Sequence, residues 1–172
     1  IAVAEAKGFK ILNLDASTAT DQRRLEAEMA FIQAECLSSL SQGHDVLVTT
    51  TRGPDDPMVA RVAEAITTSR ATSSDVNARL GTALGQLVSD IRRKTKMQRI
   101  AISGGDTSGH ALTQLRADAL SAVAPLAPGA PLCRVHTRAD PAIDGLEVTL
   151  KGGQMGQPTF FLEAKGGPQR EA

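Results

Sequence analysis

A glycine-rich segment with small polar side chains, Ser103-Gly-Gly-Asp-Thr-Ser-Gly109, has the residue types and spacing that suit anion binding. It follows an apolar stretch, Ile100 to Ile102, that predicts a buried strand, and a helical pattern begins after it. Gly104 and Gly105 would let a ligand approach the backbone closely. The free amides and the positive dipole end of the following helix would favour phosphate. An ordinary tight turn between a strand and a helix, with no ligand, is the alternative interpretation.

Three polar residues follow the glycine pair, and each has two interpretations. Asp106 is placed to hold Mg²⁺ through water, as carboxylates do in phosphoryl-transfer sites, or to cap the helix. Thr107 and Ser108 either donate hydrogen bonds to phosphate or cap the helix with their hydroxyl groups. The sequence leaves these alternatives open.

A second glycine cluster, Lys151-Gly-Gly-Gln-Met-Gly156, follows another predicted strand. Lys151 could neutralise a nucleotide phosphate, and the alternative is an exposed lysine at a strand end. Gly152, Gly153 and Gly156 would let this segment fold over a nucleotide. Taken together, the two segments predict a nucleotide site built from two loops.

The elements that must position these residues alternate between strand and helix over the first two-thirds of the chain. This alternation predicts an α/β fold with a mainly parallel open sheet, flanked by helices on both faces, and with additional strands near the C-terminus. Strands are predicted over 9–14, 45–50, 99–103, 132–137 and 146–151, helices over 21–42, 58–67, 75–96 and 159–164, a polar loop over 15–20 and a turn over 127–131. Because such sheets bind ligands beyond the carboxyl ends of their strands, both glycine segments and the loop Arg52–Pro57 are expected at such an edge.

The domain prediction is one nucleotide-binding domain over residues 1–165, followed by a frayed tail over 166–172. The first residues, IAVAEAKG, already resemble the end of a helix that stops at Gly8. We therefore expect the chain to be a fragment of a longer two-domain protein.

Composition excludes several classes of partner. Nineteen basic and nineteen acidic residues cancel, so no net positive field favours nucleic acid or an anionic membrane. With four Phe and no Trp or Tyr, an aromatic platform for stacking bases is not expected. Cys36 and Cys133 fit no metal-binding spacing and are predicted to be buried free thiols. No apolar run approaches the length of about 20 residues that spans a membrane, and no signal peptide is visible, which favours a cytoplasmic protein.

With these residues in view, the chain resembles the carboxyl-terminal nucleotide-binding domain of the four-carbon acid sugar kinase family. Ile1–Phe9 is similar to the family helix that follows its first nucleotide motif, and Ser103–Gly109 is similar to the family's GGET or GGDT loop. Leu150–Gly156 with the pair Phe160-Phe161 is similar to the family ending, KSGNFG followed by two phenylalanines. The resemblance covers nearly the whole chain.

The resemblance implies ATP-dependent phosphorylation of a hydroxyl group on a sugar acid such as threonate, erythronate or 3-oxo-tetronate, with Mg²⁺. It implies that ATP is bound by Gly104–Thr107 and by the loop around Gly153. The chain departs from the family in lacking its serine-rich ATP motif and its amino-terminal sugar-acid domain, so the fragment alone is expected to be inactive. The residues that bind the sugar acid are expected outside this chain. The resemblance leaves open which sugar acid is used and which residue is the catalytic base. It also leaves open how many subunits assemble, and a homo-oligomer is one of the alternatives.

Two other classes of function compete with a kinase. The first is a non-catalytic module that binds a nucleotide or a phosphorylated metabolite. The second is an interaction or assembly domain in which both glycine turns are purely structural.

Overall fold

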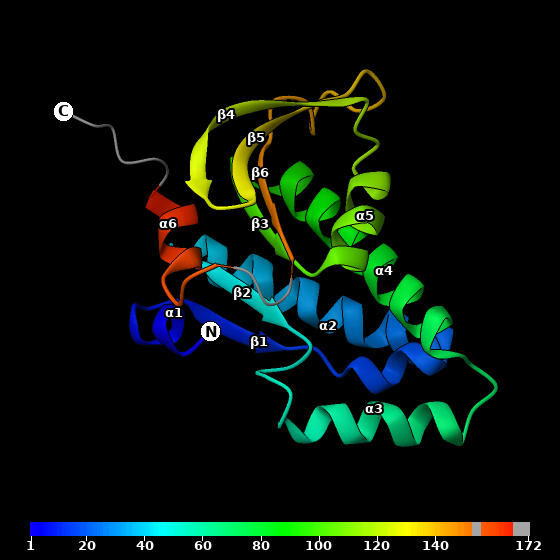
Figure 1. The fold of residues 1–172 in the computed structure, drawn as a ribbon. Coiled ribbons are helices and arrows are strands. Elements are labelled where there is room, and N and C mark those ends of the chain that lie inside the picture. Colours follow the sequence, from blue (N-terminus) through cyan, green and yellow to red (C-terminus); the bar gives the residue numbers. More distant parts are fainter. Residues whose placement is uncertain (153–155, 167–172) are drawn as a thin grey trace. The chain divides into compact units, whose positions relative to one another are not determined.

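The computed structural model describes residues 1–152 and 156–166 and contains both helices and strands (Figure 1). The chain divides into two compact units, Ile1–Ala83 and Leu84–Ala172, with the boundary inside helix α4, Ser73–Lys94. The predicted α/β class is confirmed. Each unit has its own sheet and is described separately.

The first unit is built on two parallel strands. Its elements are α1 (Ala2–Ala6), β1 (Lys10–Asn13), the 3₁₀ helix η1 (Ala16–Thr20), α2 (Gln22–Ser41), β2 (Val46–Thr49) and α3 (Pro57–Thr67). Strands β1 and β2 pair in parallel, from Lys10 opposite Val46 to Asn13 opposite Thr49. The carboxyl ends of both strands therefore lie at the same edge of this small sheet.

Helix α2 forms because its apolar side chains recur at helical spacing. Leu25, Ile32 and Cys36 lie on one stripe and are buried. The side chain of Asp21 caps the helix by accepting a hydrogen bond from the Arg24 amide at 3.0 Å. The helix predicted over 21–42 therefore has both a buried apolar stripe and a side-chain cap.

The polar loop predicted over 15–20 is instead a buried 3₁₀ helix, η1. The carboxylate of Asp15 accepts hydrogen bonds from the amide of Ser17 at 3.0 Å and from its hydroxyl at 2.6 Å. Because these local hydrogen bonds satisfy the polar groups, a segment rich in Ser and Thr can be buried here. The sequence concealed this burial because its polar side chains are typical of an exposed connection.

The second unit contains a four-stranded mixed sheet. Its elements are the later part of α4, β3 (Arg99–Ser103), α5 (Gly105–Gln114), β4 (Ala119–Ala127), β5 (Ala130–His136), β6 (Glu147–Lys151) and α6 (Phe160–Gly166). The strand order is β3-β6-β5-β4. Strands β3 and β6 are parallel, whereas β5 pairs with both of its neighbours in antiparallel fashion. Additional strands therefore lie in the C-terminal third, as predicted.

Strand β4 is a strand that the sequence did not reveal. Its residues are mostly exposed and do not alternate between apolar and polar, and Pro125 lies inside it. Proline is tolerated on an edge strand because its missing N–H can face away from the neighbouring strand, and β4 is at the edge of the sheet. The turn to β5 passes through Gly129, whose φ is 72°. Thus β4 and β5 form a hairpin where only a turn and one strand were predicted.

The core of the second unit holds helix α5 firmly in place. Its buried residues come from β3, α5 and the residue that caps its end, β5, β6 and the β5–β6 connection, and are Ile100, Ile102, Ala111, Leu115, Val135, Ile143, Leu146 and Val148. Helix α5 also lies very close to α4. A Cβ added at Gly85 would be 2.8 Å from the Cα of Ala111 and 2.8 Å from the Cβ of Gln114. The absence of a side chain at Gly85 is therefore what permits this helix contact.

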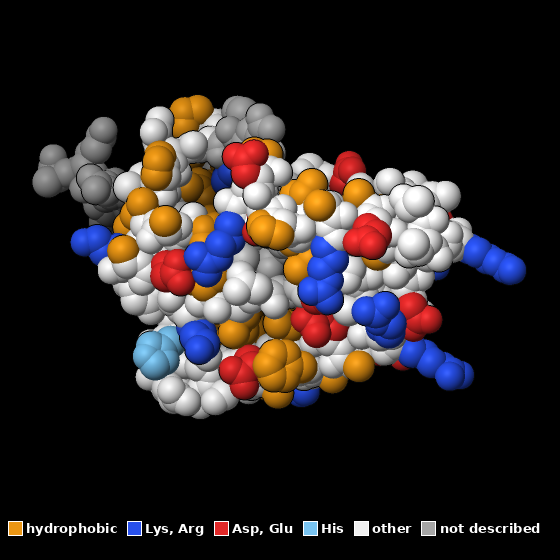
Figure 2. Space-filling view, turned by 90° about the horizontal axis from the view of Figure 1, so that it is seen from below, with side chains coloured by type: hydrophobic (Ala, Val, Ile, Leu, Met, Phe, Trp, Pro, Cys, Tyr) orange, Lys and Arg blue, Asp and Glu red, His pale blue; other side chains and the backbone are white. Residues whose placement is uncertain are grey.

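The surface agrees with the balanced charge of the sequence. Figure 2 shows acidic and basic side chains interspersed with hydrophobic ones on the face drawn, without a continuous field of one sign. Among the described residues, no helix has both the length and the apolar composition needed to cross a membrane.

Candidate functional site

The two glycine segments begin side by side at one edge of the sheet of the second unit. Strands β3 and β6 run parallel, with Ser103 opposite Lys151 at their carboxyl ends. The amide of Gly104 then donates a hydrogen bond to the carbonyl of Lys151 at 2.9 Å. Because ligands of parallel sheets bind beyond the carboxyl ends of the strands, this edge is the place where a two-loop site can form.

The amino end of α5 presents backbone amides at this edge. Gly104 is the N-cap residue, and no side chain in the described part of the chain caps this end with a hydrogen bond. The amides of the first turn have no partner within the helix, so they and the helix dipole favour an anion. A Cβ added at Gly105 would meet nothing within 4 Å. The space beside the first turn is therefore open to a ligand.

The three polar residues after the glycine pair differ in their surroundings. Asp106 is exposed in the first turn of α5, and the N-cap position assigned to it as an alternative belongs to Gly104. Thr107 is half-buried. Ser108 is buried, and its hydroxyl donates to the Gly104 carbonyl at 2.7 Å. A hydrogen bond from Ser108 to phosphate would require that internal bond to break, whereas Asp106 is accessible as it stands.

Lys151 is held in a defined position where β6 ends. Its ammonium group donates to the carbonyl of Gly152 at 3.1 Å and lies 5.4 Å from the centre of the Phe160 ring. Gly152 is exposed, and Gly156 has a φ of 89°, in the left-handed region that favours glycine. The predicted site residue Gly153, together with residues 154 and 155, lies outside the described residues. The described part of the segment thus contributes one cation and two glycines to the edge.

The loop after β2, predicted to lie at a sheet edge, belongs to the first unit. The guanidinium group of Arg52 contacts the Glu5 carboxylate at 2.9 Å, and this hydrogen bond lowers the pKa of Glu5. The carboxylate of Asp56 accepts from the amide of Met58 at 2.9 Å and from the amide of Arg52 at 2.7 Å, and these bonds lower the pKa of Asp56. These charged groups therefore organise their own loop.

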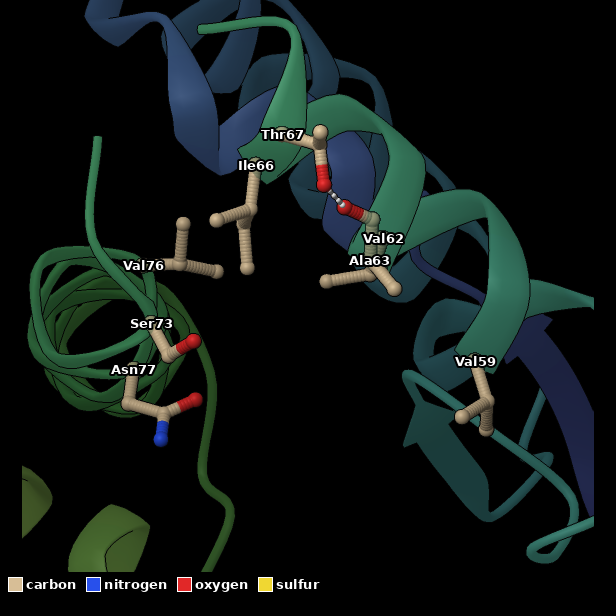
Figure 3. Close-up of a pocket in the computed structure, with 8 residues that line it drawn as sticks. All are labelled: Val59, Val62, Ala63, Ile66, Thr67, Ser73, Val76 and Asn77. Carbon is tan, nitrogen blue, oxygen red and sulfur yellow. Dashed lines mark hydrogen bonds between the residues drawn. The ribbon is translucent and has the colours of Figure 1, made fainter. Parts of the chain in front are cut away.

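A pocket of about 440 Å³ lies in the first unit, between α3 and the start of α4 (Figure 3). It is lined by Val59, Val62, Ala63, Ile66, Thr67, Ser73, Val76 and Asn77. The lining is chiefly aliphatic, and the Thr67 hydroxyl is occupied by a hydrogen bond to the Ala63 carbonyl at 2.9 Å. None of the residues predicted to bind phosphate lines this pocket.

Metal binding at the glycine edge would depend on few protein ligands. Within residues 1–152 and 156–166, no three His, Cys, Asp or Glu side chains gather in a way that could hold a metal ion. Mg²⁺ commonly binds through one or two carboxylates together with waters and substrate phosphates. An exposed Asp106 beside open helix amides fits that pattern.

The sequence also did not reveal the residues that support this edge from behind. Arg99, the first residue of β3, donates hydrogen bonds to Glu147 at 2.6 and 2.8 Å. It also bonds to carbonyl groups at the end of α6. The only local signal was a basic residue at the start of a strand, which is too common to indicate a role.

Comparison with known proteins agrees with this architecture. Residues 1–161 match the family described as the nucleotide-binding C-terminal domain, so the chain belongs to that family. The resemblance to the carboxyl-terminal domain of four-carbon acid sugar kinases is thereby confirmed. A 3-oxo-isoapionate kinase of Paraburkholderia graminis is 37% identical over 158 residues, which make up 92% of this chain and 33% of that protein. The chain therefore spans about a third of the length of this curated relative.

Solved structures share the fold at low sequence identity. The Haemophilus influenzae protein HI1011 has a TM-score of 0.71 and 18% identity, over 94% of this chain and 35% of that one. A Bordetella bronchiseptica protein, a domain of unknown function crystallised with bound citrate as a domain-swapped dimer, has a TM-score of 0.64 and 19% identity. That match covers 95% of this chain and 35% of the Bordetella chain.

Proposed function

We propose that this chain is the ATP-binding domain of a kinase that phosphorylates a hydroxyl group of a small sugar acid. The observation that carries the proposal is the hydrogen bond from the Gly104 amide to the Lys151 carbonyl, because it joins the two glycine segments at one edge. Membership of the nucleotide-binding family and the similarity to a 3-oxo-isoapionate kinase support the same assignment. For the acceptor we propose a sugar acid of the threonate, erythronate or 3-oxo-tetronate type.

The residues at the edge would divide the work of holding ATP. The first-turn amides of α5, from Gly105 to Thr107, would bind phosphate oxygens, and Lys151 would neutralise part of their charge. Asp106 would hold Mg²⁺ through water. When bound, Mg²⁺ supplies charge neutralisation at the phosphate that is transferred. Gly152, Gly153 and Gly156 would let the second segment approach the nucleotide.

The test of this proposal uses the open space beside Gly105. We expect the chain to bind ATP with Mg²⁺ in a calorimetric titration. A Gly105→Val variant should fold normally, since a Cβ there meets nothing, yet its branched side chain would occupy the space proposed for phosphate. Its Kd should rise about tenfold or more, which corresponds to about 1.4 kcal/mol.

Gly166→Val is the matched control, because Gly166 also has open space around a Cβ but lies at the end of α6. Equal affinities for ATP in all three proteins would contradict the proposed site. Binding of inorganic phosphate or a phosphorylated metabolite as tightly as ATP would favour the non-catalytic binding module. No binding of any of these ligands would favour the assembly domain.

A further inference from the structure

Strand β3 and the residue that follows it are hydrogen-bonded to the elements on either side of the second glycine segment. At the start, Gly104, directly after β3, bonds to Lys151 at the end of β6. At the far end, helix α6 follows the segment, and its last carbonyls accept hydrogen bonds from Arg99, the first residue of β3. The end of β6 and the carboxyl end of α6 are therefore both tied to β3 or to the residue directly after it.

Arg99 makes the second of these ties with its whole guanidinium group. One terminal nitrogen donates to the carbonyl of Ala164 at 3.0 Å and to that of Lys165 at 3.3 Å. The other two nitrogens donate to one carboxylate oxygen of Glu147 at 2.8 and 2.6 Å. A cation is favourable at the carboxyl end of a helix, and the planar fork of arginine can serve a carboxylate and carbonyls at once. Arg99 thus joins the starts of β3 and β6 to the end of α6.

The other end of α6 reaches the predicted phosphate-binding residues. Phe160, the first residue of α6, is 2% exposed. Its ring lies 5.4 Å from the ammonium group of Lys151 and 3.5 Å from where a Cβ on Gly156 would lie. A displacement of α6 would therefore move the ring against which both Lys151 and Gly156 are placed.

We propose that Arg99 is a positioning residue for nucleotide binding. By holding the carboxyl end of α6, it keeps Phe160, and through it Lys151 and Gly156, in register with the amino end of α5. Arg99 lies at the opposite end of β3 from Ser103, roughly 13 Å away at about 3.3 Å per residue, so it acts without touching the phosphate. This inference rests on the proposed function, because it names what supports that same site.

The experiment compares Arg99→Met with Arg134→Met. Arg134 is a matched control because its guanidinium lies 3.8 Å from Glu147, so its loss removes a cation from the same carboxylate. Two measurements are needed for each variant: the Kd for ATP with Mg²⁺ at a temperature well below unfolding, and amide hydrogen exchange over residues 160–166 without nucleotide. The exchange measurement tests the tie itself and needs no nucleotide.

We expect Arg99→Met to fold, to exchange faster in α6 and to raise the Kd about tenfold. Arg99→Lys should give an intermediate Kd, since a single ammonium group cannot serve the carboxylate and both carbonyls. Arg134→Met should leave the Kd and the exchange rates within about twofold of the unmodified chain.

The outcomes separate this inference from the proposed function. If the unmodified chain does not bind ATP, the proposed function fails and the positioning role falls with it. If the chain binds ATP and Arg99→Met exchanges faster in α6 but binds ATP equally well, the positioning role alone is overturned. An equal rise of Kd in Arg134→Met would overturn it too, because the effect would then arise from the charge beside Glu147. If Arg99→Met does not fold, the Kd and the hydrogen exchange of α6 are measured for Arg99→Lys and Glu147→Gln instead.

Discussion

The two adjacent glycines at the start of α5 have different physical reasons to be glycine. Gly104 has a φ of 127°, a conformation that side chains rarely adopt, and a Cβ there would be 3.2 Å from the Thr107 hydroxyl oxygen. Gly105 has an ordinary φ and open space. We expect Gly104→Ala to lower the free energy of unfolding by about 1–3 kcal/mol, and Gly105→Ala to leave it within about 1 kcal/mol. Denaturant unfolding followed by circular dichroism measures both, and similar losses in the two variants would contradict the assignment.

A single substitution at Asp106 tests whether this carboxylate holds Mg²⁺. An Asp106→Asn change keeps the size of the side chain and removes the charge that would attract Mg²⁺. Because this side chain is exposed and does not cap the helix, the free energy of unfolding should change by less than about 1 kcal/mol. We expect weaker binding of ATP in the presence of Mg²⁺ and little change in its absence. A loss of affinity that is the same with and without Mg²⁺ would exclude the metal role.

At the scale of elements, the close contact between α4 and α5 determines where the candidate site lies. A side chain at Gly85 would meet the backbone of Ala111, which can move only with its helix. Gly85→Ala should therefore lower the free energy of unfolding by about 1–3 kcal/mol, although alanine favours helix more than glycine does. Gly109→Ala is the control, because Gly109 is inside α5 and a Cβ there meets nothing. That variant should gain up to about 1 kcal/mol, and a gain at both positions would refute the close contact.

The reactivity of Cys36 tests how closely helix α2 is packed. Burial raises the pKa of the Cys36 thiol to about 11, with a further contribution from the charge of Glu35. An upward shift of two pH units lowers the thiolate fraction about a hundredfold at neutral pH. A thiol reagent should therefore modify the half-buried Cys133 long before Cys36, and the two rates should converge in denaturant. In the unfolded chain the Cys36 thiol loses its proton near pH 9, whereas in the folded chain it keeps the proton up to about pH 11. Loss of the proton therefore favours the unfolded state, and Cys36 should reduce the free energy of unfolding as the pH rises from about 9 to 11.

Some elements could be predicted from the sequence because their signals are local. The strand Arg99–Ser103 is bounded as predicted, since an apolar run that ends in two glycines fixes both its type and its end. Strand β4 was missed because an exposed edge strand with a proline lacks the alternation that reveals half-buried strands. The tie from Arg99 to Ala164 could not be foreseen, because it joins residues 65 positions apart through tertiary packing. The glycine residues of the site were thus visible in the sequence, whereas their support was not.

At the scale of the whole molecule, the geometry bears on where ATP would bind, and the similarity to a kinase bears on which reaction the proposal names. The candidate phosphate-binding edge lies within the second unit, and the aliphatic pocket lies within the first. The chain matches only 33% of the length of the similar kinase. We propose that the acceptor is bound by segments that correspond to the part of this kinase beyond the matched third.

This assignment predicts that ATP binding and phosphate transfer can be separated. Transfer requires the acceptor hydroxyl to be held in line with the terminal phosphate, and positioning supplies most of the rate in such reactions. The chain alone should bind ATP with Mg²⁺ but release no more ADP with threonate, erythronate, a 3-oxo-tetronate or 3-oxo-isoapionate than without an acceptor. A longer protein that joins this domain to the remaining segments of such a kinase should release ADP with one of these acids, and the same Gly105→Val change should suppress that release. A coupled assay for ADP measures both proteins, and acceptor-dependent turnover by the chain alone would show that the acceptor site lies within these residues.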